Sequence, residues 1–194
     1  MQRRELLMSF HAGLALLAAA GAVLAPLPSL AQVPGRTSAA ELSRSANNAL
    51  QQLYAKIPAA KAIGKEAHAV LVFPSVTKAG LGIGGQYGEG ALLKGGKAVA
   101  YYNTAGASYG LQAGAQTYGY AMFFMNEAAL KQLDKTDGFE VGVGPSVVVL
   151  DEGKARTITS TTMKDDVYAF IFGQKGLMAG LGVQGNKITR ITPK

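Results

Sequence analysis

The sequence predicts an α+β fold in which an N-terminal helical arm packs on a strongly curved, barrel-like and largely antiparallel β-sheet. Apolar residues recur at helical spacing over about residues 39–56, whereas short β-branched and aromatic runs begin at Ala69. Glycine accounts for 25 of the 194 residues and interrupts many of these strand-like runs. Glycines at such positions favour a sheet that bends sharply.

The first 31 residues have the composition of a signal peptide. Two arginines precede the uncharged apolar stretch 12–25, and the segment PLPSLAQ then supplies a helix breaker and small residues at Ser29 and Ala31. We expect cleavage after Ala31, which would place the protein in the periplasm or at a membrane surface. An uncleaved anchor is the alternative, because Leu6–Ala25 carries no charge and approaches spanning length.

Charge and cysteine content narrow the possible partners. Without its leader the chain keeps a net charge of +6, one less than the +7 of the full sequence, which favours anionic partners such as lipid headgroups. The basic residues are scattered, and no nucleic-acid reading motif is present, so no nucleic-acid partner is expected. The absence of cysteine excludes disulfides, thiolate metal sites and a lipidated cysteine.

The helical arm is predicted from a capping box. Ser38 and Glu41 have the required spacing, and Pro58 ends the first helix at about residue 56 and opens a second, short helix through Glu66. After residues 32–37, a flexible lead-in, residues 38–194 are expected to form one domain. The arm either packs its apolar stripe on a core or offers it to anionic lipid, and its basic residues are Arg44, Lys56, Lys61 and Lys65.

The remaining chain is predicted to form strands and one short helix. AVLVF, residues 69–73, is expected to end at Pro74, and residues 97–125 are too long for one strand and are expected to form at least two. Asn126 is expected to cap a helix over 126–133. Further strands are expected within 139–150 and 167–191, with turns at 151–154 and 185–186 and an exposed loop over 160–166.

The stretch KAGLGIGGQYGEG, residues 78–90, matches the nucleotide-binding pattern G-x-G-x-x-G. That pattern requires a following helix and an acidic residue about twenty positions later, and neither is evident. Gly80, Gly82 and Gly84 instead occupy alternate positions, so an extended strand would have one face free of side chains for a close neighbour. The echo AGLGI at 79–83 and AGLGV at 179–183 suggests two such strands side by side.

Three stretches closely resemble the signatures of the SYLF domain family: LVFPSVTKAGLGIGGQYGEGALL, GASYGLQAGAQ and QKGLMAGLGVQG. The resemblance covers about Ala40 to Ile191. The positions that match the family pattern are Phe73, Pro74, Lys78, Gly80, Gly84, Gly85, Gly88, Gly90, Ser108, Gly110, Gln112, Gly114, Gln116, Lys175, Gly176 and Gly180.

The resemblance implies peripheral binding of anionic phospholipid, with no catalysis and no cofactor. In eukaryotic relatives, phosphoinositide binding is linked to an amphipathic N-terminal helix and basic residues, which here implies Arg44, Lys56, Lys61, Lys65, Lys78 and Lys175. The structural glycines implied are Gly80, Gly82, Gly84, Gly85, Gly88, Gly90, Gly110, Gly114, Gly176 and Gly180. Actin binding is not expected of an exported protein, and the chain has no tryptophan.

The inventory of reactive side chains does not favour an enzyme. His68 is the only histidine after the leader, so a hydrolytic triad and a histidine metal site both lack parts. The adjacent carboxylates at 151–152 and 165–166 are typical of solvated turns. Two other functions stay open: a structural or protein-binding module of the envelope, and a small outer-membrane barrel suggested by the alternation in 100–124.

Overall fold

The structure is a computed structural model that describes residues 37–134, 139–140, 146–150 and 164–194. All described residues belong to one compact unit, Pro34–Lys194. The predicted signal peptide, the turn at 151–154 and most of the predicted loop at 160–166 lie outside the described residues. The described elements, in chain order, are α1 (Ala39–Lys56), α2 (Pro58–Glu66), β1 (Ala69–Lys94), β2 (Lys97–Phe124), α3 (Glu127–Lys131), the 3-10 helix η1 (Gln132–Asp134), β3 (Phe139–Glu140), β4 (Val147–Leu150) and β5 (Val167–Ile191).

The helical arm forms where the sequence predicts it. Ser38 Oγ accepts a hydrogen bond from the Glu41 backbone N–H at 3.3 Å, which caps α1, and Pro58 occupies the first turn of α2. Asn126 caps α3 by accepting from the Ala129 N–H at 2.8 Å. These three helix starts are confirmed.

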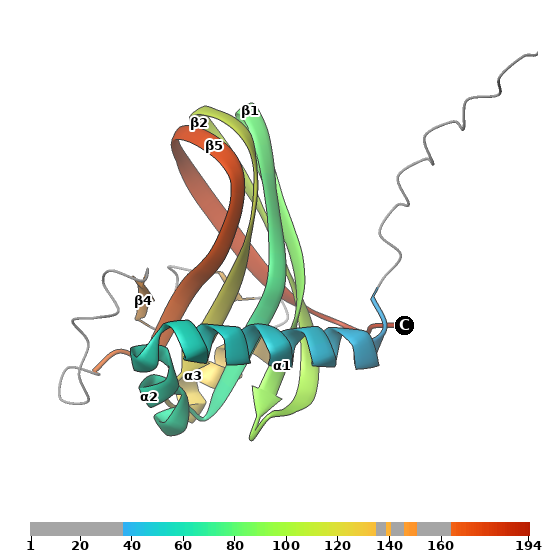
Figure 1. The fold of residues 1–194 in the computed structure, drawn as a ribbon, viewed down its shortest axis with the longest axis vertical. Helices are drawn as coiled ribbons and strands as arrows, with labels where there is room; N and C mark the ends of the chain where they lie inside the picture. Colours follow the sequence, from blue (N-terminus) through green and yellow to red (C-terminus); the bar gives the residue numbers. More distant parts are fainter. Residues whose placement is uncertain (1–36, 135–138, 141–145, 151–163) are drawn as a thin grey trace, which may run out of the picture. The chain divides into compact units, whose positions relative to one another are not determined.

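The strands form one sheet with the order β1-β2-β5-β3, and β4 pairs with β5 in parallel while the other pairings are antiparallel. This confirms the predicted α+β class with a curved, largely antiparallel sheet. β1, β2 and β5 have 26, 28 and 25 residues, far more than an ordinary strand. Figure 1 shows that the three strands rise together, turn over and return.

The predicted strand ends are wrong in three places. β1 continues through Pro74, which lies at a register shift between Phe73 and Val76, where a missing N–H costs no regular ladder bond. Residues 97–124 form one strand, β2, and not two. The predicted turn at 185–186 lies inside β5, where Gly185 and Asn186 pair with Ala107 and Gly106.

The glycines of β1 allow the strand to fold back on itself. A Cβ atom placed on Gly80 would lie 2.5 Å from the Gly84 Cα, and one placed on Gly88 would lie 2.8 Å from the Ser75 carbonyl oxygen. The close neighbours of these glycines are therefore in the other limb of the same strand. Gly82 has a φ of 71°, so residues 80–84 form a bend and not a regular extended strand.

The two glycine-rich echoes do not lie side by side. Ala79–Ile83 pairs with one edge of β2 and Ala179–Val183 with the other, so β2 separates them. The two similar sequences lie at the same height of the sheet, because Leu81 and Ala179 both pair with Ala113 of β2. The segment 78–90 is strand throughout, and no helix follows it, so it lacks the geometry of a dinucleotide-binding turn.

Two apolar clusters hold the lower part of the sheet, because alternate strand residues face opposite sides. Leu53 of α1 belongs to the first cluster with Val72, Phe123 and Phe170, and the Phe123 and Phe170 ring centroids are 5.3 Å apart. The second cluster lies on the other face and joins the sheet to α3 and η1 through Leu133. The apolar stripe of α1 is therefore buried in the core, as the first of the two predicted alternatives required.

Candidate binding surface

We call the upper part of the sheet the arch: residues 75–88 of β1, 104–118 of β2 and 172–187 of β5, where the three strands turn over (Figure 1). Among the arch side chains that the structure describes, three long aliphatic ones face solvent. Leu81 is 83% exposed, Ile83 68% and Leu177 89%. We call these three side chains the tip patch.

The strand register places Leu81 and Leu177 at one level of the arch, while Ile83 follows Leu81 across a register shift and pairs with Tyr109. Leu81 pairs with Ala113 of β2, and Leu177 pairs with the nearby Ala115 across the opposite edge of β2. Helices α1 and α2 cover the lower part of the sheet and leave this end uncovered (Figure 1). Single exposed aliphatic residues are ordinary, but three gathered at one end of a molecule mark an interaction surface.

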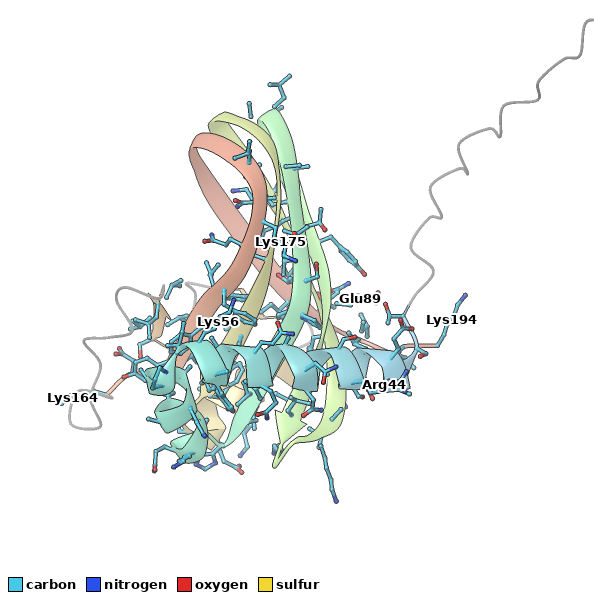
Figure 2. The ribbon with its side chains drawn as sticks, in the orientation of Figure 1. Arg44, Lys56, Glu89, Lys164, Lys175 and Lys194 are labelled. Atoms are coloured by element: carbon cyan, nitrogen blue, oxygen red, sulfur yellow. The ribbon has the colours of Figure 1, made fainter. Side chains whose placement is uncertain are left out.

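The charge of the arch has one sign. Its three segments contain no aspartate or glutamate, and their only charged residues are Lys78, Lys175 and Lys187. Lys175 and Lys187 are exposed, whereas Lys78 is only 6% exposed. Figure 2 shows Lys175 on the arch, well away from Arg44 on α1. Lys175 stands two positions before the exposed Leu177 on β5, whereas Lys187 pairs with Glu140 of β3.

The basic residues predicted for the arm are all exposed: Arg44 and Lys56 on α1, and Lys61 and Lys65 on α2. The apolar stripe beside them is not available, since Leu42, Leu50 and Leu53 are buried against the sheet. The arm can therefore offer cations to a partner but no apolar surface. Of the two remaining predicted lysines, Lys175 lies on the arch and not on the arm, and Lys78 is buried.

A groove beside the start of α1 has the opposite character. Its volume is about 590 Å³, and it is lined by residues that include Glu41, Glu89 and Tyr87. The Tyr87 hydroxyl donates to Glu89 Oε1 at 2.9 Å. Two carboxylates make this groove unsuitable for an anionic ligand.

The interior of the arch is polar. The Tyr118 hydroxyl donates to Gln86 Oε1 at 2.9 Å, and Gln86 Nε2 donates to Asn186 Oδ1. Burial raises the pKa of Tyr118, and burial followed by the neighbouring Tyr118 raises the pKa of Tyr120. Both hydroxyls therefore stay protonated, and able to donate, at neutral pH.

The residues considered for catalysis do not assemble into a site. Asp166 accepts from Asn126 Nδ2 at 2.8 Å and from the Ser146 N–H at 3.1 Å, and the first of these bonds is the main cause that lowers the pKa of this carboxyl group. Through these two hydrogen bonds, Asp166 connects Asn126, the cap of α3, to Ser146, the residue before β4. His68 is exposed, and its backbone N–H donates to the Phe124 carbonyl at 2.8 Å. Within the described ranges no three His, Asp or Glu side chains gather as metal ligands would.

Sequence reasoning missed the tip patch. The signal was present, because Leu81 and Ile83 alternate with glycines, and Leu177 stands beside Gly176. The pattern of residues 80–84 predicts a role only for the glycine face and none for the aliphatic side chains, which the structure places in solvent beside the bend at Gly82. Among the helices that the structure describes, none combines the length and the apolar character needed to cross a membrane.

Comparison with known families bears on the arch directly. Residues 105–192 match the family model Ysc84, described as "Las17-binding protein actin regulator". This segment belongs to the SYLF family. The match begins within β2 and ends just after β5, so it includes Leu177 and Lys175 but not Leu81 or Ile83.

Membership places the SYLF segment among domains that bind lipids or proteins in a regulatory role, a family not known for catalysis. No curated protein matches the chain. The SYLF resemblance of the GASYGLQAGAQ and QKGLMAGLGVQG stretches is thereby confirmed, since both lie within the matched residues.

Proposed function

We propose that this SYLF protein binds the anionic phospholipid surface of the cell envelope peripherally, without catalysing a reaction and after export and removal of its leader. The observation that carries the proposal is the tip patch, with Leu81, Ile83 and Leu177 exposed above an arch that contains lysines and no acid. The aliphatic side chains would enter the acyl region while Lys175 meets headgroup phosphates. Peripheral proteins that combine these two contributions bind anionic bilayers in preference to neutral ones.

The magnitudes are sufficient for peripheral binding. Complete burial of one leucine or isoleucine side chain is worth about 1.5 to 3 kcal/mol, so the tip patch offers at most roughly 5 to 9 kcal/mol. Each lysine near an anionic surface adds about 1 kcal/mol, and salt weakens this contribution. The apolar contribution is therefore the larger one, and the lysines supply the preference for anionic lipid.

The arch supports the proposal better than the arm does. The arm carries four exposed basic residues, but its apolar stripe belongs to the core of the folded protein. Insertion of the arm would require α1 to leave that core and expose Leu53 and its neighbours. The tip patch requires no such rearrangement, because its side chains are already exposed.

Vesicle flotation of the chain from Gln32 onward tests the proposal. We expect recovery with vesicles that contain phosphatidylglycerol and little recovery with pure phosphatidylcholine. The triple variant Leu81→Ser, Ile83→Ser and Leu177→Ser should reduce the recovered fraction of protein at least tenfold. Val99→Ser is the control, because Val99 is an exposed aliphatic residue, 50% exposed, that lies near the β1–β2 hairpin, and this variant should float as the parent protein does.

Near-zero recovery with both kinds of vesicle would overturn the proposal. The alternative function, a protein-binding module of the envelope, predicts a partner that co-purifies with the parent protein and no lipid. The description of the matched family names a protein that is bound, which favours this second candidate. Loss of such a partner in the triple variant would assign the tip patch to protein binding.

A further inference from the structure

A cavity of about 170 Å³ lies inside the folded sheet, at the base of the arch. Its eight lining side chains come from strands that are distant in sequence, β1, β2, β4 and β5, and the polar ones include Gln86, Thr104, Tyr118 and Asn186. Val149 of β4 is 44% exposed, so one lining residue of the cavity reaches solvent, and we take the mouth of the cavity to lie on this side. A ligand can therefore reach the cavity without unfolding the sheet.

One lining group lacks a partner. Thr104 is 1% exposed, and its Oγ1 atom has no hydrogen bond, alone among the buried side-chain polar atoms of the described residues. A buried hydroxyl left unpaired costs about 1 to 3 kcal/mol, so native proteins rarely retain one without a ligand or a bound water. The neighbouring polar side chains do not relieve it, because Tyr118 and Gln86 bond to each other and Gln86 bonds to Asn186.

The size and chemistry of the walls restrict the ligand. An apolar cavity of about 150 Å³ accommodates one benzene molecule, so this cavity has room for roughly a six-carbon ring or chain. Val76, Ile171 and Val149 supply apolar contact, whereas Thr104 supplies a hydroxyl. All eight lining side chains are uncharged, so an ionised ligand would lose its hydration without compensation.

We propose that this cavity binds a small neutral amphiphile, with an apolar body of about six carbons and one hydroxyl or carbonyl group that hydrogen-bonds to Thr104 Oγ1. The amide of Gln86 lies in the same wall and limits how the polar end of the ligand is oriented. This site is separate from the tip patch and does not depend on membrane binding. It gives the protein a second ligand, recognised by shape and one hydrogen bond.

Phenol and toluene test the proposal, because they have nearly the same shape and only phenol carries a hydroxyl. Both are titrated calorimetrically, without vesicles, into the chain from Gln32 onward. We expect phenol to bind the parent protein and to shift the side-chain amide NMR signals of Gln86 and Asn186. In Thr104→Val the phenol-to-toluene affinity ratio should fall about fivefold or more, as the loss of one hydrogen bond predicts.

Two further variants make the result unambiguous. Thr189→Val is the matched control, because Thr189 is exposed on β5, and it should leave both affinities unchanged. Val149→Trp narrows the mouth from an exposed position and should weaken both ligands, which tests the site even where Thr104→Val fails to fold. The proposal is overturned where phenol does not bind at millimolar concentration, where Thr104→Val keeps the parent ratio, or where Val149→Trp binds both probes as the parent does.

Discussion

At the scale of single residues, the glycines of β1 differ in what they permit. A Cβ atom on Gly90 would lie 2.5 Å from the Val72 carbonyl oxygen and 2.6 Å from the Phe73 ring, both in the opposite limb of β1. A Cβ atom on Gly85 would meet nothing closer than the Gly106 carbonyl oxygen at 3.7 Å, an ordinary contact. The same residue type therefore has a steric role at one position and none at the other.

Gly90→Ala and Gly85→Ala form a matched pair on one strand. We expect Gly90→Ala to lower the free energy of unfolding by about 1 to 3 kcal/mol, because backbone and ring must move to admit the methyl group. Gly85→Ala should be neutral, or stabilise slightly by restricting the unfolded chain. Urea denaturation measures both. Equal destabilisation by the two substitutions would contradict the fold-back of β1.

The sequence predicts that glycine serves packing here but not which glycine meets which atom. Density and spacing are local properties, visible in residues 78–90. The close contact of Gly90 with Val72 depends on where β1 turns back, and that position is set by the φ of 71° at Gly82. A backbone angle of this kind leaves no trace in the pattern beyond the presence of glycine.

At the scale of elements, α1 was predictable to the residue because its signals are local. The Ser38 cap, the helical period and Pro58 all lie within the helix or beside it. The strands were not predictable in the same way, because Pro74 and the glycines are residue types that usually end a strand. Pairing with β2 on both sides of Pro74 keeps β1 continuous, and such long-range hydrogen bonds are absent from a local pattern.

Burial of the α1 stripe carries a testable consequence. Leu53 is fully buried among Val72, Phe123 and other residues of the first cluster. We expect Leu53→Ala to lower the free energy of unfolding by about 2 to 5 kcal/mol, the usual range for a core leucine. Gln52→Ala, at an exposed position of the same helix, should change it by less than about 0.5 kcal/mol.

Far-UV and near-UV circular dichroism, followed together during thermal unfolding, measure this effect. Because α1 shares a core with β1, β2 and β5, both signals should shift to lower temperature in Leu53→Ala by the same amount. A variant whose helix signal melts first while the sheet stays folded would show that the arm is a separable surface helix. That result would restore the arm as a candidate for membrane insertion.

At the scale of the whole folded unit, the three most exposed aliphatic side chains of the described residues and the helical cover lie at opposite ends. The arm, α3 and the β1–β2 hairpin surround the lower sheet, and the arch rises away from them (Figure 1). The candidate surface depends on this arrangement. Leu81 and Leu177 are almost a hundred residues apart in sequence, and both strands pair with β2, at Ala113 and Ala115. The net charge of the sequence predicted an anionic partner, whereas the location of the candidate contact surface could be found only from the fold.

The orientation of the molecule on a bilayer is the consequence that belongs to this scale. The chain contains no tryptophan, so a single introduced tryptophan reports its own surroundings. We expect Leu177→Trp to shift its emission to shorter wavelength on phosphatidylglycerol vesicles and to be quenched by lipids brominated along the acyl chain. The physical reason is that the tip patch enters the apolar layer while the lower sheet stays in water.

Val99→Trp is the control for this orientation, because Val99 is half exposed near the β1–β2 hairpin, at the end of the sheet away from the arch. Its emission should stay at the wavelength seen without vesicles, and brominated acyl chains should not quench it. Lys56→Trp adds a reporter on the arm with the same expected behaviour. Quenching at position 56 together with none at position 177 would mean that the protein meets the bilayer through its arm, which would contradict the arch-first orientation.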